Sequence, residues 1–221
     1  EIPARFLGPA LEQLRELAAR GLEERRIAYG DLRTLGTPRR LVLYVRGLAE
    51  GQTPVRTRVK GPARRVAFDE GGRPTAAAEG FARNQGVRVE DLVVENVGQV
   101  EYVFAVKEEG GRPTREVLAE LAPELIAGLH FPKPMRWGDL DFSFIRPIRW
   151  LLALLGPEVV PFGIAGLTSG RTTFGHRLLS KGPITVADPD DYFRRMRAAF
   201  VLVDPEERRA VIREQVRAAA A

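Results

Sequence analysis

The stretch Leu32–Val45, LRTLGTPRRLVLYV, decides the fold because two β-rich runs flank a short turn that contains Gly36 and Pro38. Ahead of it, residues 4–26 repeat leucine and alanine at steps of three and four, which predicts an amphipathic helix. A helix followed directly by a hairpin departs from the regular alternation that builds a parallel sheet. The pattern therefore favours an α+β fold with a mixed sheet and packed helices.

Further elements are predicted on both sides of this stretch. Thr75 is expected to cap a helix that stops at Gly86, and Pro123 is expected to kink or break a helix over residues 115–129. Asp188 and Asp204 each precede a proline at the first position of a helix, so the C-terminal end is predicted to be helical. Strands are predicted at residues 55–59, 92–96, 100–107, 148–155 and 159–164.

Composition excludes several classes of site. The 221 residues contain no cysteine and two histidines, which excludes a disulfide framework, a cysteine nucleophile and a multi-histidine metal site, so we expect no metal site. No glycine-rich phosphate loop, dinucleotide fingerprint or nucleophile elbow is present. No apolar run approaches the ~20 residues of a membrane span. We therefore expect no membrane partner.

The net charge of +5 is unevenly distributed along the chain. Residues 33–73 carry a net charge of +7 and residues 133–181 carry +4, whereas residues 74–132 carry −5. Most of the basic residues are arginine, whose planar fork of donors suits phosphate. Two positive stretches around an acidic one indicate a polyanionic partner such as RNA.

Candidate contact residues come from three motifs: Thr37–Leu41, Lys133–Trp137 with Phe144–Trp150, and Thr172–Arg177. Basic and aromatic side chains alternate in the second motif, and such side chains stack on unpaired bases. The tryptophans are more readily explained as core residues. The candidates are Arg39, Arg40, Lys133, Arg136, Arg146, Arg149, His176 and Arg177. Arg40 and Arg149 are expected to be the most structural of these, since each abuts an apolar run.

Six blocks of this sequence resemble the N-terminal region of the β subunit of bacterial heterotetrameric glycyl-tRNA synthetase. They lie in one order along the chain: Glu1–Ala4, Thr37–Leu41, Ala78–Arg83, Lys133–Trp137, Phe144–Trp150 and Gly175–Arg177. The resemblance covers the whole chain. It implies that residues 1–221 are an N-terminal fragment without the family's first strand and later parts.

The resemblance implies a role in the ATP-dependent attachment of glycine to tRNA(Gly). ATP, with magnesium, would be used by the complete enzyme at a separate α subunit, and this fragment would hold no cofactor and be non-catalytic. The implied partners are tRNA(Gly), the α subunit and a second β subunit, in a cytoplasmic assembly of two α and two β chains. Residues 1–186 would form a tRNA-binding domain similar to the editing-type domain of the phenylalanyl-tRNA synthetase large subunit, followed by a helical segment over 187–221.

Two alternatives remain open at this stage. One is a residual editing hydrolase of mischarged tRNA, with His176 and Thr172 or Thr173 in a pocket. The other is a purely structural domain that docks against the α chain or against other parts of the β chain. An arginine track on the surface would favour RNA binding, and a broad apolar patch would favour docking.

Overall fold

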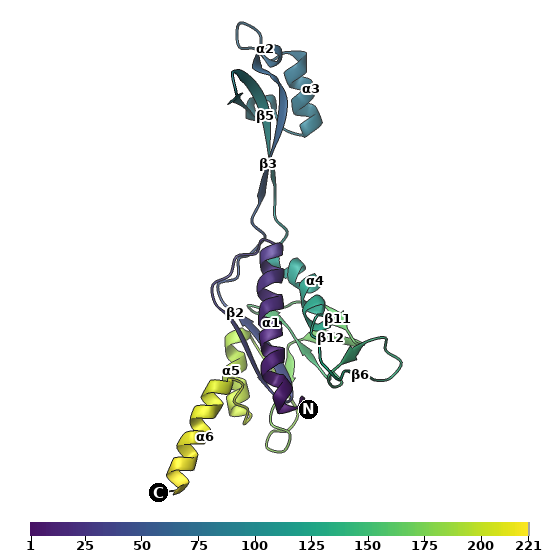
Figure 1. Cartoon of the computed structure of the whole chain (residues 1–221), viewed down its shortest axis with the longest axis vertical. Helices are drawn as coiled ribbons and strands as arrows, with labels where there is room; N and C mark the ends of the chain where they lie inside the picture. Colours follow the sequence, from purple (N-terminus) through teal and green to yellow (C-terminus); the bar gives the residue numbers. More distant parts are fainter. Residues whose placement is uncertain (221) are drawn as a thin grey trace. The chain divides into compact units, whose positions relative to one another are not determined.

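The computed structural model describes residues 1–220, with the side chains of all of them except residues 108 and 109. The chain folds as two compact units (Figure 1). Unit 1 contains residues 1–52 and the chain from Arg112 onward, and unit 2 contains Thr53–Gly111. Helices and small sheets occur in both units, which confirms the α+β prediction. The sequence alone did not separate unit 2.

Two helices form the main core of unit 1. Helix α1 spans Ala4–Glu24 and packs against helix α4, Thr114–Ala127. A Cβ atom at Gly21 of α1 would lie 2.5 Å from a methyl group of Leu121 on α4, so glycine permits this close approach. Helix α4 continues through Pro123, so a break at this proline is wrong.

A hairpin lies against these helices. Strand β1, Leu32–Thr37, pairs antiparallel with strand β2, Arg40–Val45, as the sequence predicted. On one face of the hairpin, Leu41, Leu43 and Val45 pack against the core of α1 and α4. On the other face, Val42 packs against a cluster that includes Tyr192 and Met196. Both faces of β2 are therefore covered.

Residues 135–185 form short strands because Pro and Gly interrupt the apolar runs. Strand β12 pairs antiparallel with β11 and parallel with β8, which makes this small sheet mixed. Three further antiparallel pairs in this segment are hairpins: β6 with β7, β9 with β10, and β13 with β14. The bounds are β6 Met135–Arg136, β7 Ser143–Phe144, β8 Leu151–Leu152, β9 Leu154–Leu155, β10 Glu158–Val159, β11 Gly163–Ile164, β12 Leu167–Gly170, β13 Thr172–Phe174 and β14 Pro183–Thr185.

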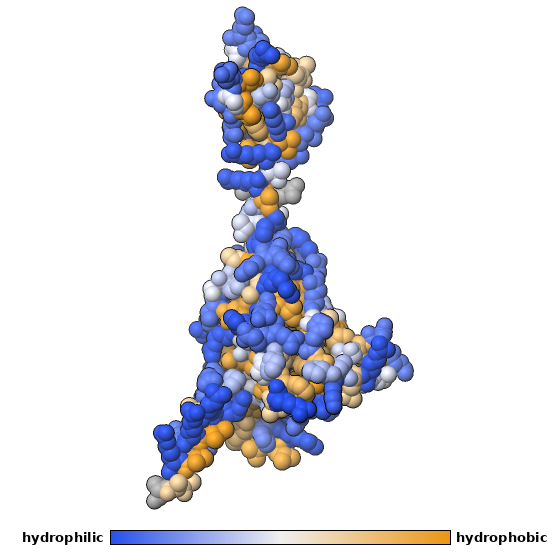
Figure 2. Space-filling view, viewed as in Figure 1, coloured by the Kyte–Doolittle hydropathy of each residue, from blue (hydrophilic) through white to orange (hydrophobic). Residues whose placement is uncertain are grey.

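The C-terminal end is helical, as predicted. Helix α5 spans Pro189–Ala198, and Oδ1 of Asp188 accepts a hydrogen bond from the Asp191 N–H at 2.8 Å. Helix α6 spans Pro205–Ala220, and Oδ1 of Asp204 accepts from the Glu206 N–H at 2.9 Å. Both predicted caps are confirmed. Apolar side chains remain exposed along one side of α6 (Figure 2).

Unit 2 is a three-stranded antiparallel sheet with helices on one face. The strand order is β3 (Val55–Ala63), β5 (Val100–Glu109), β4 (Leu92–Val97). The helices are α2 (Arg64–Ala67), α3 (Ala76–Gln85) and the 3-10 turn η1 (Val89–Asp91). Gly86 ends α3 at φ +69°, as predicted, and the Thr75 hydroxyl donates to the carbonyl groups of residues 66 and 67. Thr75 is the N-cap residue of α3, as predicted, but its side chain makes no capping hydrogen bond.

In the described part of the chain, none of the helices combines the length and apolar character that a membrane crossing requires. The expected division at residue 186 and the likeness to an editing-type domain stay predictions. Helix α5 packs into unit 1 through the cluster of Val186, Tyr192 and Met196.

Candidate nucleic-acid interface

All eight candidate residues lie in unit 1. Arg39 lies in the turn of the β1–β2 hairpin, and Arg40 is the first residue of β2. Lys133, Arg136, Arg146 and Arg149 come from the segment between α4 and β8, and His176 and Arg177 follow β13. The structure thus collects into one unit three motifs that are up to 138 residues apart in sequence.

Arg40 is an interior residue. Its side chain is buried, and its Nη2 donates to the carbonyl oxygen of Phe174 at 3.0 Å while Nη1 lies 2.7 Å from the sulfur of Met196. The guanidinium carbon lies 5.9 Å from the centre of the Trp150 ring. Nε is buried without an acceptor among the described residues. Arg40 therefore has the structural role expected of it, with little of its side chain left for RNA.

Arg39 and Arg136 have acidic partners at the surface. Nε of Arg39 lies 3.8 Å from the Glu1 carboxylate, and Nη2 of Arg136 lies 3.3 Å from the Asp141 carboxylate across the β6–β7 hairpin. Exposed ion pairs of this kind contribute ~0–1 kcal/mol, so a phosphate can compete for either arginine.

Lys133, Arg149 and Arg177 are exposed cations without an ion pair or hydrogen bond to any described residue. Arg146 is also exposed, and its Nη1 donates only to the carbonyl oxygen of its neighbour Ile145, at 2.6 Å. No contact within residues 1–220 therefore supports a structural role for Arg149. These side chains keep their donors in water, where phosphate oxygens can replace the water.

His176 organises the turn that carries Arg177. Its Nδ1 accepts hydrogen bonds from the N–H groups of Leu178 and Leu179 at 3.2 and 3.3 Å, which places the proton of the neutral ring on Nε2. Its own N–H donates to the carbonyl oxygen of Ala199 at 2.9 Å. Within residues 1–220, no hydrogen bond joins His176 to Thr172 or Thr173. The contacts of His176 thus give no support to a hydrolase.

Sequence reasoning missed other residues on the same loop, between β13 and β14. Lys181 is exposed and has no ion pair within the described chain. Leu178 and Leu179 are 80% and 61% exposed, and apolar surface is visible on this loop in Figure 2. Two consecutive leucines between Gly175 and Gly182 were the signal that could have found them, because apolar pairs in a glycine-bounded turn are exposed.

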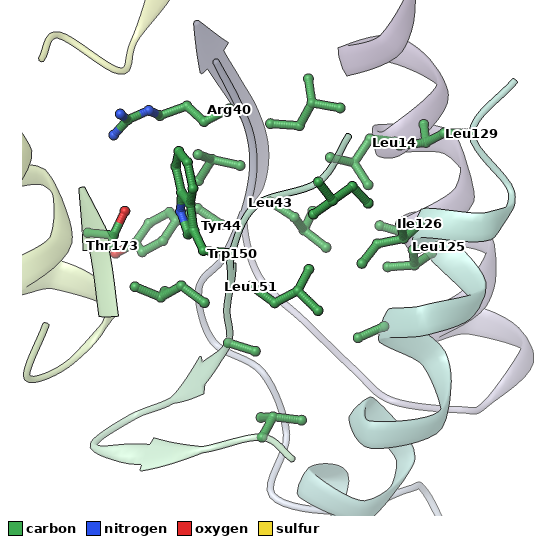
Figure 3. Close-up of a pocket in the computed structure, with 18 of the residues that line it drawn as sticks. Leu14, Arg40, Leu43, Tyr44, Leu125, Ile126, Leu129, Trp150, Leu151 and Thr173 are labelled. Atoms are coloured by element: carbon green, nitrogen blue, oxygen red, sulfur yellow. The ribbon is translucent and has the colours of Figure 1, made fainter. Parts of the chain in front are cut away.

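Arg39, Arg40, Arg146 and Arg149 line one cavity of about 480 Å³. Figure 3 shows Arg40, Trp150 and Thr173 on one side of β2, and leucines of α1 and α4 on the other. Most of the lining is aliphatic. Trp137 packs into the α1–α4 core, as predicted for the tryptophans, whereas Trp150 faces the cavity. Residues 1–220 contain no group of three acidic or histidine side chains placed to hold a metal ion.

Comparison with known proteins gives one consistent family. The profile of the family described as "Glycyl-tRNA synthetase beta subunit" matches residues 1–221. Proteins named "Glycine--tRNA ligase beta subunit" are similar over nearly the whole chain: that of Desulforamulus reducens is 60% identical over 98% of it, that of Desulforudis audaxviator 58% over 100%, and that of Bacillus subtilis 42% over 100%. The chain spans 31–32% of the length of these relatives.

Proposed function

This chain belongs to the glycyl-tRNA synthetase β subunit family, and on that premise we propose that it binds tRNA(Gly) within a glycine–tRNA ligase. The family match over the whole chain is the observation that carries the proposal. Part of the charge map supports it, because residues 133–181, with a net charge of +4, lie in unit 1, whereas the stretch 33–73 is divided between the two units.

The contact set that we propose consists of the exposed cations Lys133, Arg146, Arg149 and Arg177, with Lys181 added. Arg39 and Arg136 would join them by exchanging an exposed carboxylate for a phosphate. Arg40 and His176 would act indirectly, Arg40 by holding the Phe174 carbonyl and His176 by shaping the turn of Arg177. Phosphate contacts fix the position of an RNA without reading its sequence.

The chemistry of the ligase would take place elsewhere. Adenylate formation with ATP and magnesium would belong to the α subunit, in a cytoplasmic assembly of two α and two β chains, and residues 1–221 would be non-catalytic. The exposed apolar side chains of Leu178, Leu179 and Phe200 support a second, compatible role in docking against another part of that assembly.

The proposal is tested by measuring binding of tRNA(Gly) to the complete α–β enzyme across a salt series. A triple variant, Lys133→Ala with Arg149→Ala and Arg177→Ala, removes three cations that have no partner in the described chain. The logarithm of the affinity falls with the logarithm of the salt concentration, and each lost phosphate contact makes this slope shallower by about 0.7–0.9. We therefore expect the slope of the triple variant to be shallower by about 2–3.

The matched control replaces three exposed arginines that are already neutralised by carboxylates: Arg88→Ala, Arg112→Ala and Arg209→Ala. This variant has the same change in formal charge. Its slope is expected to change by less than the loss of one phosphate contact would produce. Equal slopes for the two triple variants would contradict specific contact by Lys133, Arg149 and Arg177. An unrelated tRNA distinguishes recognition of tRNA(Gly) from general affinity for phosphate.

A further inference from the structure

The sheet of unit 2 has two different faces. Val103 and Ala105 of the central strand β5 are buried on the face that α2 and α3 cover (Figure 1), where Val103 packs with Ala67 and Ala78. Side chains along a strand point alternately to opposite faces, so the even-numbered residues of β5 lie on the other face, called here the open face. Those residues and their neighbours on β3 and β4 therefore make the exposed surface of the sheet.

Aromatic and apolar side chains occupy the open face on β5 and β4. Tyr102 and Phe104 of β5 are half-buried, and the register pairs Phe104 with Val93 of β4. Val93, Val97 and Val100 are 41%, 45% and 40% exposed. Apolar surface that stays exposed on one face of a small unit indicates a binding surface.

Basic side chains line the β3 side of the open face. Lys60 pairs with Phe104 across the ladder, and cross-strand partners share a face, so Lys60, Arg58 and Arg56 all lie on it. All three are exposed. Residues 53–73 carry a net charge of +4, which is unit 2's share of the first positive stretch of the chain. A row of cations beside a row of aromatic rings suits a nucleic-acid strand, which carries phosphates beside its bases.

The contact between Lys60 and Tyr102 shows how a base can bind. Nζ of Lys60 lies 3.5 Å from the centre of the Tyr102 ring, so the ring turns its face, not its edge, to the open side. A base can take the place of this ammonium group on the ring, because stacking on an aromatic side chain is stronger than an exposed cation–π contact. The ammonium group then remains within reach of the phosphate next to that base.

Arg58 has an exchangeable partner as well. It forms an ion pair across β5 with Glu95 of β4 at 3.1 Å, and its side chain is 62% exposed. Exposed ion pairs are weak, so a phosphate can replace the carboxylate. The cations beside the aromatic rings can therefore turn to a nucleic-acid backbone without leaving a buried charge unpaired.

We propose that the open face of unit 2 binds a single strand of RNA, at a site separate from the tRNA contacts of unit 1. Tyr102 and Phe104 lie about 6.8 Å apart along the strand, which gives each ring room for its own base. Sheets that bind single-stranded RNA stack two or three bases on such rings. Bases inside a duplex hide their faces in the stack, so the ligand is unpaired. That the strand is RNA rests on the function proposed for unit 1.

Binding to the complete α–β enzyme tests the proposal with two probes: decauridylate, and a ribose-phosphate strand of the same length without bases. Because both probes have the same phosphates, the ratio of the two affinities measures base stacking. We expect the natural enzyme to bind decauridylate at least about 5-fold more tightly for each base that stacks. The double variant Tyr102→Leu with Phe104→Leu keeps apolar side chains on the sheet and removes both rings. It is expected to lose this preference, while an unchanged affinity for the base-free strand reports an intact fold.

The role of charge is tested on the two faces of the same sheet. Lys60→Ala removes a cation of the open face, and Lys107→Ala removes one from the opposite face, where Lys107 follows Val103 and Ala105 in the alternation of β5. Lys60→Ala is expected to make the salt slope for decauridylate shallower by about 0.7, the value for one phosphate contact with a single strand. Lys107→Ala is expected to leave this slope unchanged.

Four outcomes would overturn the proposal. Equal affinity of the natural enzyme for both probes would mean that only phosphates are bound. A preference for decauridylate that persists in the double variant would place the stacking outside unit 2. If the double variant lost as much affinity for tRNA(Gly) as for decauridylate, the open face would belong to the tRNA interface. Tighter binding of the deoxyribose strand of the same sequence would exclude RNA as the preferred ligand.

This test and the test of tRNA binding can fail separately. The triple variant of Lys133, Arg149 and Arg177 leaves both aromatic rings of unit 2 in place, and the double variant leaves every proposed tRNA contact in place. A failure of the proposed function therefore shows in the first variant, and a failure of the stacking site shows in the second.

Discussion

Arg40 and Arg149 have similar sequence settings, since each is an arginine immediately before an apolar run. The structure gives them opposite surroundings. Arg40 begins a strand with two covered faces, so its side chain enters the interior and bonds to residues 134 and 156 positions away. Arg149 precedes β8 outside any ladder and remains exposed. Local sequence cannot distinguish them, because their partners are chosen by chain segments far away in sequence.

Asp191 provides a residue-scale prediction about pH. Its carboxylate is buried and accepts hydrogen bonds from Arg194, the Ala187 N–H and Arg195, and these hold its pKa at about 2, below the ordinary value of 3.8. A carboxylate whose pKa is lower in the folded state than in the unfolded state stabilises the fold. This contribution is complete above about pH 4. The contribution is lost as pH falls from about 4 to 2. Asp191→Asn is therefore expected to lower stability at pH 7 and to flatten this acid-dependent decline.

Urea unfolding at several pH values between 7 and 2.5 measures both effects. Asp139→Asn is the control, since Asp139 is exposed and has no hydrogen bond or ion pair among the described residues. An acid-dependent decline of the same steepness in Asp191→Asn and in the unsubstituted chain would contradict the assignment.

At the scale of elements, unit 2 depends on close contact between β3 and α3. A Cβ atom at Gly61 of β3 would lie 2.5–2.8 Å from the ring of Phe81 on α3, closer than packed atoms can approach. Gly61→Ala is therefore expected to destabilise unit 2 by about 1–3 kcal/mol, because the ring must move within a small core. The free energy of unfolding, followed by a signal from unit 2, measures this.

Gly80→Ala is the matched variant on the same helix. A Cβ atom there would meet nothing within 4 Å, and Gly80 lies in the interior of α3. Alanine restricts the unfolded chain and favours helix, so an increase in stability of about 0.5–1 kcal/mol is expected. If both substitutions changed stability in the same direction, the proposed contact between Gly61 and Phe81 would be refuted.

At the scale of the whole molecule, the chain leaves unit 1 after Gln52 and re-enters it at Arg112, and these two points are neighbours. The Gln52 N–H donates to the Arg112 carbonyl at 3.0 Å, and the Thr114 N–H donates to the Glu50 carbonyl at 2.9 Å. A short Gly-Gly link can therefore replace residues 53–111. We expect the shortened chain to keep the cooperative unfolding of unit 1 and the salt slope of tRNA binding, since every proposed tRNA contact lies in unit 1.

Circular dichroism and the same salt series check this deletion. Loss of cooperative unfolding would show that unit 1 needs unit 2 to fold. If the salt slope became shallower by more than the loss of one phosphate contact would produce, part of the tRNA interface would lie in unit 2.

The sequence by itself determined the α+β class, the hairpin at residues 32–45, both aspartate caps and the family, because each depends on residues close together or on blocks in a fixed order. Tertiary structure alone decided that Pro123 stays within a helix, that Thr75 bonds elsewhere and that Arg149 is exposed. It also decided that residues 53–111 form a separate unit. These outcomes depend on packing between segments far apart in the chain, where burial and hydrogen bonding outweigh local preference.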